Sequence, residues 1–315
     1  MKSLFSVYLY RGVIKMTLTI KQQLILLTDK GATYGLTWNY FKSFLKYYQA
    51  SDRLALAECQ QLYNETVANS PQLKDKQLDL TAYDLSTGLL EKLAAQSFMI
   101  GDAIYPELWL QLPQPPLVIF YEGHLECLQQ PLVSLVGTRQ ISYYGREMTS
   151  QMASAIALEG WCCVSGLALG VDRVVHESAA KVRHRSTIGI IATGTDLYYP
   201  KANTYLQQQM ASHHLLLSEY LPHKRAQRHH YIMRNRLVAG ISSATLVMEA
   251  AYKSGSLITA NYAVQSNREV FSLPGRITDT HSEGCNDLIQ HGAIPIVSIS
   301  QTIEQLKQIF AYQNS

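Results

Sequence analysis

Long apolar runs are missing from this 315-residue sequence. No segment reaches the roughly 18 uninterrupted apolar residues that a membrane span requires. The first 15 residues also lack an apolar core followed by small residues, as a secretion signal would have. We therefore expect a cytoplasmic protein without a membrane span, in which residues 1–15 are a ragged N-terminal extension. Hydrophobic residues still make up 47% of the chain, which suffices for a core of ordinary size.

Cysteine is scarce and has no metal-binding or disulfide pattern. The five cysteines are odd in number, contain no C-x-x-C, and include the adjacent pair Cys162 and Cys163 within an apolar run. Such residues behave as small hydrophobic side chains in a reducing cell. We expect no disulfide, no structural zinc and no other metal or cofactor.

The nucleotide-binding glycine motifs are absent too. Neither G-x-G-x-x-G nor G-x-x-x-x-G-K-[ST] occurs, so neither a dinucleotide pyrophosphate nor a P-loop nucleotide is the expected ligand. Instead, the apolar run in "LVSLVGTRQISYYG" (132–145) ends at Gly137, Thr138 and Arg139. A guanidinium supplies a fixed fork of donors that suits a phosphodiester. Taken alone, the motif is better explained by pairing of Arg139 with a carboxylate such as Glu147.

Charge is distributed unevenly along the chain. Residues 58–129 hold 3 Lys/Arg against 10 Asp/Glu, whereas residues 130–315 hold 16 against 12. Within residues 220–248 there are five Lys/Arg and three histidines but no acid. A local excess of this kind attracts phosphate, although a solvated basic face explains it equally well.

Two kinds of periodicity divide the chain near residue 95. Between residues 19 and 93 apolar residues recur at helical spacing, and four prolines within residues 106–116 then indicate a connector. Seven short, mainly apolar runs follow and alternate with amphipathic stretches: 132–136, 161–165, 187–192, 214–218, 244–248, 269–273 and 294–298. This pattern predicts a small all-helical domain, residues 16–95, followed by an α/β domain, residues 96–315, with a doubly wound, mainly parallel sheet.

Ligands of open α/β sheets bind beyond the carboxyl ends of the strands, so the residues after each apolar run are candidates for a site. These loops are rich in small and hydroxyl residues, which expose backbone N–H groups near helix N-termini and favour an oxyanion. Four loops suited to phosphate binding at one rim predict a ligand with several phosphates, such as a polymer, rather than a single phosphate. The candidates are Gly137, Thr138, Arg139, Ser165, Gly166, Lys201, Arg234, Asn235, Arg236, Lys253, Ser254, Gly255 and Ser256. Neighbouring tyrosines could stack bases or simply pack the rim: Tyr143, Tyr144, Tyr198, Tyr199 and Tyr231.

Acidic residues at the same rim raise the question of whether the protein is an enzyme. Asp172, Asp196, Glu219 and Glu249 follow four different strands and form no D-x-D pair. Each equally fits a helix N-cap or a partner for a rim arginine, so we expect no two-metal catalysis and no catalytic residue. The strongest enzymatic alternative is a nucleotide-processing hydrolase in which Glu249 acts on a ribose beside the 254–256 loop.

Seven motifs in order resemble the DNA-processing protein family called DprA or Smf: "VSLVGTRQISYYG", "VSGLALGVDRVVHESA", "TGTDLYYPKAN", "LLSEYLP", "RNRLVAGISSATLVMEAAYKSGSLITANYA", "REVFSLPG" and "GCNDLIQHGA". The resemblance spans roughly residues 105–300 and implies an extended Rossmann fold without known enzymatic activity. It implies a protein that binds single-stranded DNA, protects it, and helps load the RecA recombinase during natural transformation. Arg139 and Lys201 would be the principal phosphate contacts. The same pocket would be lined by Gly137, Ser165, Gly166 and residues 254–256.

The resemblance also bears on the rest of the chain. The helical segment is similar in position to the SAM-like domain of some members, and we expect the chain to lack the C-terminal winged-helix domain of others. In this family, self-association and RecA contacts map to the C-terminal part of the Rossmann domain, which would place residues 284–297 near a homodimer interface. The physical alternative is that apolar residues there belong to the core: Leu288, Ile289, Ile294 and Ile296.

Overall fold

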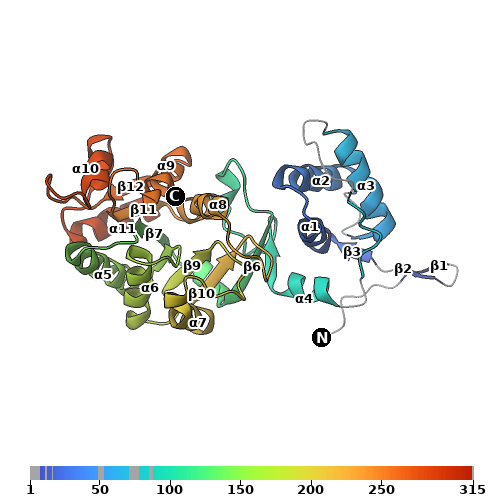
Figure 1. Cartoon of the computed structure of the whole chain (residues 1–315), viewed down its shortest axis with the longest axis horizontal. Helices are drawn as coiled ribbons and strands as arrows, with labels where there is room; N and C mark the ends of the chain where they lie inside the picture. The colour runs from blue at the N-terminus through green and yellow to red at the C-terminus, as the bar shows by residue number, and fades with distance from the viewer. Residues whose placement is uncertain are drawn as a thin grey trace. The chain divides into compact units, whose positions relative to one another are not determined.

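The computed structural model describes residues 8–10, 13–15, 17–48, 53–70, 78–84 and 88–313. The chain divides into two compact units, Met1–Ile100 and Gly101–Ser315 (Figure 1). Of the expected N-terminal extension, β1 (Tyr8–Tyr10) and β2 (Val13–Lys15) form an antiparallel pair. The remainder of that extension lies outside the described residues, as do residues 16, 49–52, 71–77 and 85–87 of the expected helical domain.

The first unit contains four helices among its described residues: α1 (Ile20–Asp29), α2 (Tyr34–Tyr47), α3 (Leu56–Ala68) and α4 (Leu89–Ala95). Hydroxyl side chains determine where two of them begin, because Thr19 caps α1 in a capping box with Gln22 and Thr33 caps α2. The strands are β3 (Thr17–Thr19), β4 (Arg53–Ala55) and β5 (Ser97–Met99). The antiparallel β3–β4 pair departs from the expected all-helical domain, because strands of three residues are too short to show an alternating pattern.

The second unit alternates strands and helices. Its strands are β6 (Val118–Gly123), β7 (Leu132–Gly137), β8 (Cys162–Ser165), β9 (Thr187–Ile191), β10 (Leu215–Ser218), β11 (Ala244–Glu249), β12 (Glu269–Ser272) and β13 (Ile294–Pro295). Its α-helices are α5 (Tyr143–Leu158), α6 (Val171–Val182), α7 (Thr204–His213), α8 (Arg228–Gly240), α9 (Gly255–Gln265), α10 (Glu283–Gln290) and α11 (Ile299–Gln313). Three short 3₁₀ helices are η2 (Glu107–Gln111), η3 (Leu125–Gln129) and η4 (Lys201–Asn203).

The strands of this unit hydrogen-bond in the order β13-β12-β11-β7-β8-β9-β10-β6. Every neighbouring pair is parallel except β10 and β6. From β7 the chain winds outward through β8, β9 and β10, and it then returns to the other side of β7 with β11, β12 and β13. The predicted doubly wound, mainly parallel sheet is therefore confirmed, and its topological switch point lies between β7 and β11.

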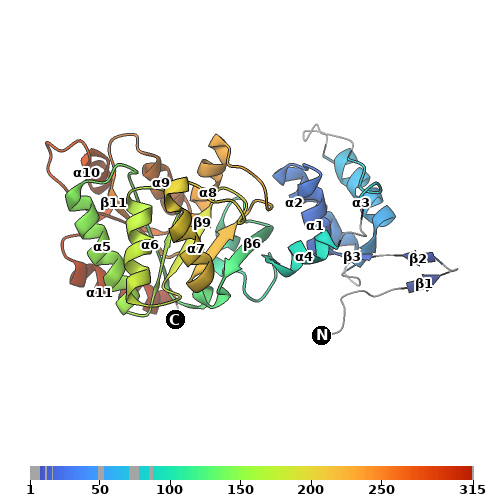
Figure 2. The same ribbon diagram turned by 60° about the horizontal axis from the view of Figure 1, so that its bottom comes forward.

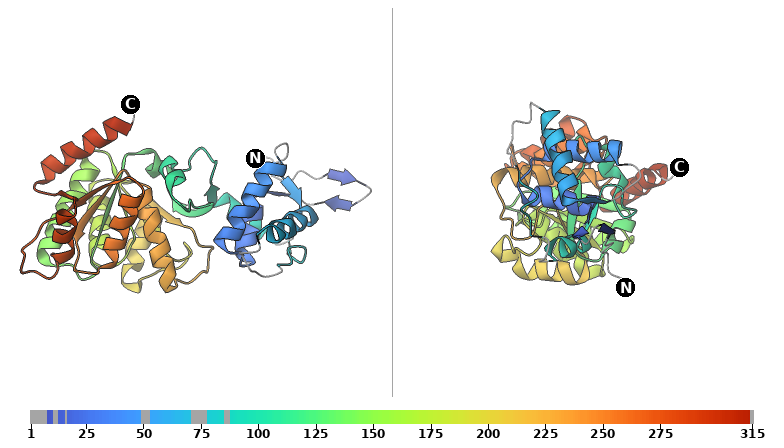
Figure 3. Two further views of the ribbon diagram at one scale, coloured as in Figure 1. Left: turned by 90° about the horizontal axis from the view of Figure 1, so that it is seen from above. Right: turned by 90° about the vertical axis from the view of Figure 1, so that its right-hand side faces the viewer.

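Helices cover both faces of the sheet, which explains why the strands are apolar at almost every position. Helices α5, α6 and α7 lie side by side on one face, whereas α8 and α9 pack together on the other (Figures 1 and 2). Helix α11, red in Figure 3, packs against α5. In the segment 284–297, Ile296 is buried in the main core, while Leu288, Ile289 and Ile294 are only half-buried.

Candidate functional site

A hollow of about 420 Å³ lies at the switch point, beyond the carboxyl ends of β7 and β8. We call it the central hollow. Its walls come from the loop after β7, the loop after β8, helix α8 and the start of α9. It brings together nine of the thirteen predicted residues: Gly137, Thr138, Arg139, Gly166, Arg234, Asn235, Ser254, Gly255 and Ser256. Segments far apart in the sequence thus meet at one place because parallel strands end at one edge of the sheet.

Two glycines at this rim are required by packing. A Cβ on Gly137 would come within 2.5 Å of Cγ2 of Val171, so only glycine lets β7 approach α6 this closely. A Cβ on Gly166 would come within 1.8 Å of Nη1 of Arg234. That guanidinium instead donates to the carbonyls of Gly166 and Ile190, the latter at 2.6 Å. Gly166 therefore leaves the space in which Arg234 is held.

Arg234 is buried, with 6% of its surface exposed, and still lines the central hollow. Burial lowers its pKa, and Arg139 lowers it further, while Asp172 opposes both effects. Asp172 accepts a hydrogen bond from the Ala168 N–H at 3.2 Å, and burial raises the pKa of this carboxyl against the pull of Arg234. A guanidinium nevertheless stays protonated in proteins. The floor of the hollow therefore carries a permanently positive group.

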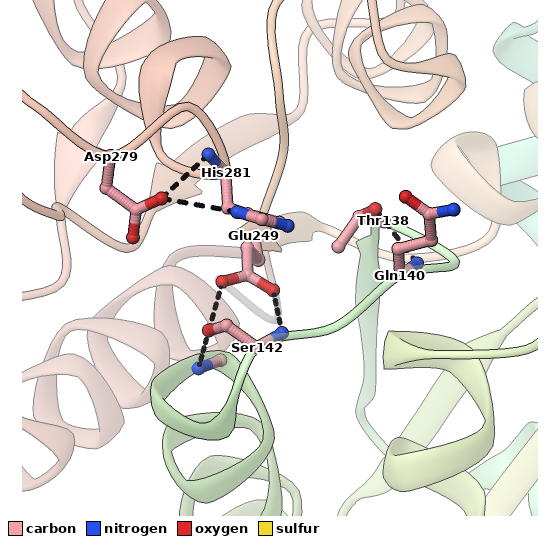
Figure 4. Close-up of polar contacts among 7 residues, drawn as sticks. Thr138, Gln140, Ser142, Glu249, Asp279 and His281 are labelled. Atoms are coloured by element: carbon pink, nitrogen blue, oxygen red, sulfur yellow. Dashed lines mark hydrogen bonds and ion pairs between the residues drawn. The ribbon is translucent and has the colours of Figure 1, made fainter.

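Helix N-termini at the rim differ in how they are neutralised. At α5, Ser142 donates its N–H and its hydroxyl to the Glu249 carboxylate, at 2.8 and 2.5 Å, and its hydroxyl accepts from Gly145 N–H (Figure 4). Asp172 stands in the first turn of α6. The first turn of α9 holds no acidic residue, and a Cβ on Gly255 would meet nothing within 4 Å. Of these three helices, α9 is the one whose positive N-terminus opens into the hollow without a carboxylate.

Arg139 stands at the mouth of the central hollow. Its guanidinium lies 5.5 Å from the ring centroid of Tyr231, a cation–π contact. Within the described residues it forms no ion pair with Glu147, which instead accepts from the Gln151 amide at 3.3 Å. The pairing that the motif alone favoured is therefore not present. Arg139 remains exposed and available to an external anion.

A smaller, mostly apolar hollow of about 80 Å³ adjoins the first on the β9 side. Tyr199, Pro200 and Tyr231 form one wall, and the two tyrosine ring centroids are 6.3 Å apart. Burial, with Tyr199 adding to it, raises the pKa of Tyr231 to about 12. The phenol is thus neutral at physiological pH. Among the tyrosines predicted near the rim, these two line a concave surface.

Four predicted residues do not reach the central hollow. Ser165 is buried and donates to the Leu135 carbonyl at 2.7 Å. Arg236 is buried on another side of α8, where Nη2 pairs with Oε1 of Glu219 at 2.6 Å. Lys201 is exposed in η4, one residue beyond the wall of the smaller hollow, and Lys253 lies 5.3 Å from the ring centroid of Tyr252. Arg236 and Ser165 act within the fold, because both side chains are covered and already paired.

Some residues that line the site were not predicted from the sequence. Gln140, Ala168 and Thr259 also line the central hollow; they lie within the quoted family motifs but were not named as candidate site residues. Gly170 is held at a φ of +75°, and a Cβ there would meet the Thr138 carbonyl at 2.2 Å, so it locks the loops after β7 and β8 together. The single glycine of "LALGVD" at 167–172, just before the expected helix, was a usable signal for this loop contact.

The rim carboxylates are occupied by contacts within the protein. Asp196 accepts from the His223 N–H at 2.7 Å, Glu219 pairs with Arg236, and Glu249 accepts from Ser142. Across the described residues, no group of three or more His, Cys, Asp or Glu side chains is arranged to hold a metal ion. In the same part of the chain, no helix combines the length and apolar character needed to cross a membrane.

The sequence matches the family of DNA recombination-mediator protein A over residues 96–307, which include the whole candidate site. The chain belongs to this family. DNA processing protein DprA of Bacillus subtilis is 40% identical over 211 residues, covering 66% of the chain and 70% of that relative. Protein Smf of Synechocystis is 42% identical over 212 residues, covering 66% of the chain and 53% of that relative. The resemblance to the DprA or Smf family is thereby confirmed.

Solved structures of the family agree with the fold. DNA processing protein A from Streptococcus pneumoniae superposes with a TM-score of 0.77 at 31% identity, covering 91% of the chain and 98% of that protein. The protein from Helicobacter pylori, whose structure was described for its single-stranded DNA binding mode, gives 0.62 at 31% identity. That match covers 68% of the chain and 96% of the Helicobacter pylori protein. The Rossmann-like α/β architecture is therefore shared.

Proposed function

We propose that this protein binds single-stranded DNA in the central hollow, mainly through the phosphate backbone and with little sequence preference. The observation that carries the proposal is the joint presence there of Arg139, Arg234 and the uncompensated N-terminus of α9. The one carboxylate in the lining, Asp172, is buried and already held by a backbone N–H. The binding mode named for the Helicobacter pylori relative supports the same ligand.

A binding role is favoured over the nucleotide hydrolase. Glu249 would have to face the 254–256 loop to act on a ribose, but it is 2% exposed and accepts from Ser142 at the start of α5. It does not line the central hollow. The relatives' names state no catalytic activity. We therefore propose a protein that holds nucleic acid without transforming it.

The family membership supports a wider role, which we propose with it. The protein would protect DNA taken up in natural transformation and help load the RecA recombinase onto it, in the cytoplasm. It would act as a homodimer through the C-terminal part of the second unit. The half-buried Leu288, Ile289 and Ile294, with the exposed Val297, offer apolar surface there for a second copy.

Fluorescence anisotropy with a labelled oligothymidylate tests the binding proposal. We expect the affinity for DNA to fall as the salt concentration rises. Arg139→Ala should lower this affinity by about tenfold or more. It should also reduce the slope of log affinity against log salt concentration by about 0.7 for each phosphate that the variant no longer neutralises. Lys181→Ala is the matched control, because Lys181 is exposed in the last turn of α6, away from the hollows. If Arg139→Ala and the parent bound equally well at a low and at a high salt concentration, the proposal would be refuted. Strong competition by a nucleoside monophosphate would favour the hydrolase.

A further inference from the structure

A third hollow, of about 500 Å³, lies between the loop after β7 and the start of α6. Arg139, Arg146 and Arg173 line it, and Glu177 is its one acidic residue. We call it the arginine groove. None of its residues except Arg139 and Gln140 belongs to the central hollow. Three guanidinium groups against one carboxylate make this groove distinctly positive.

The charge of the groove comes from side chains that are largely unengaged. Arg173 donates through Nε to Glu177 at 2.7 Å, and its side chain is 41% exposed. Within the part of the chain that the structure describes, its two Nη groups make no hydrogen bond and the Arg146 guanidinium makes no ion pair. The helix dipoles add little here, because Glu249 occupies the start of α5 and Asp172 the start of α6. The groove therefore presents free planar forks, which match phosphate oxygens.

The arginine groove is continuous with the proposed binding site at Arg139. That residue is the one side chain of the described chain that lines the central hollow, the small apolar hollow and the arginine groove alike. Helices α5 and α6 pack against each other along their length, so the loops that begin them are neighbours (Figure 2). A strand whose phosphate sits on Arg139 can thus continue over these loops toward Arg146 and Arg173.

We propose that the arginine groove binds further phosphates of the same DNA strand, so that Arg146 and Arg173 extend the site beyond the central hollow. This inference rests on the proposed function. Arginine forks bind phosphate without reading bases, so the groove adds affinity that grows with strand length and is independent of sequence. Glu177 limits that gain, because it neutralises part of the charge of Arg173.

The test compares oligothymidylates of about 4 and about 16 nucleotides, the range over which single-strand sites extend. The double variant Arg146→Ala, Arg173→Ala should bind the short strand within about twofold of the parent. On the long strand it should bind about tenfold more weakly, with the salt slope reduced by about 1.4, or about 0.7 for each arginine removed. Glu177→Gln should act in the opposite direction and tighten binding of the long strand. Lys181→Ala, on the same helix as Arg173, is the matched control, and an unchanged urea midpoint verifies folding.

The outcomes distinguish a failure of this inference from a failure of the proposed single-stranded DNA binding. If the parent binds both strands and Arg139→Ala weakens both, the proposed function stands. A double variant that then binds the long strand like Lys181→Ala would overturn the groove alone, and the groove would face a different partner such as an acidic protein. A parent that binds neither strand would overturn both.

Discussion

At the scale of single residues, the direction in which a side chain points decides whether it lines the site. Arg234 and Arg236 are both basic, both on α8 and both buried, yet one lines the central hollow and the other pairs with Glu219. Two residues along a helix differ by about 200° in direction, so adjacent positions in a motif face different surroundings. Both arginines were predicted as site residues, but the sequence could not show that only Arg234 lines the central hollow.

Two glycine-to-alanine substitutions should differ in their effect on stability. Gly166→Ala places a methyl group 1.8 Å from Nη1 of Arg234, so the free energy of unfolding should fall by about 1–3 kcal/mol and DNA binding should weaken. Gly255→Ala meets nothing within 4 Å in a helical position, so stability should stay unchanged or rise by about 0.4–1 kcal/mol. Urea unfolding of both variants measures the difference. Equal stabilities would show that Arg234 can move aside without cost.

At the scale of elements, the loops after the strands use similar residues for different purposes. Each places small or hydroxyl residues near a helix N-terminus, which the sequence pattern shows. The carboxylate that neutralises α5, however, is Glu249, which is 107 residues away from Ser142. Such a long-range partner has no local signal, so the candidate catalytic role of Glu249 and its capping role could be distinguished only once β7 and β11 were placed side by side.

The capping role of Glu249 predicts a loss of stability without a loss of binding. Glu249→Ala leaves the Ser142 N–H and hydroxyl without their acceptor, so the free energy of unfolding should fall by about 1.5–3 kcal/mol. Glu249→Gln keeps one oxygen acceptor and should lose less. Chemical denaturation measures the free energy of unfolding. In a salt titration, oligothymidylate binding by Glu249→Ala should have the same slope as binding by the parent. A stable Glu249→Ala variant that no longer binds DNA would instead place this carboxylate in the binding site.

At the scale of the whole molecule, the proposed binding surface and a group of histidines lie at opposite ends of the parallel strands. The binding surface lies beyond the carboxyl ends of the strands, whereas a group of histidines lies at the opposite edge, where His184 and His213 stack with ring centroids 4.6 Å apart. Burial, with the neighbouring histidines adding to its effect, lowers the pKa of His214 to about 4. Burial likewise lowers the pKa of His176, on α6, to about 3.

These two histidines predict that acid destabilises the fold. In the folded protein they stay neutral until pH about 4 and 3, whereas unfolded histidine takes up a proton near pH 6.5. The unfolded state therefore binds more protons below that pH, and each group should lower the free energy of unfolding by up to about 1.4 kcal/mol per pH unit. Urea unfolding between pH 7 and 4.5 measures the slope. His176→Phe should flatten it, and an unchanged slope would assign the acid sensitivity to other groups.

The sequence by itself determined the order of the parallel strands and helices of the second unit, because mainly apolar runs alternating with amphipathic ones are local signals of a sheet covered on both faces. It also determined the residue types at the rim, since the loops after parallel strands must meet at one edge. Only the tertiary structure decided which of these residues share a hollow, which carboxylates serve as caps, and that Arg146 and Arg173 stand beside Arg139. Those facts depend on contacts between segments far apart in the chain, where side-chain direction and burial are set by packing.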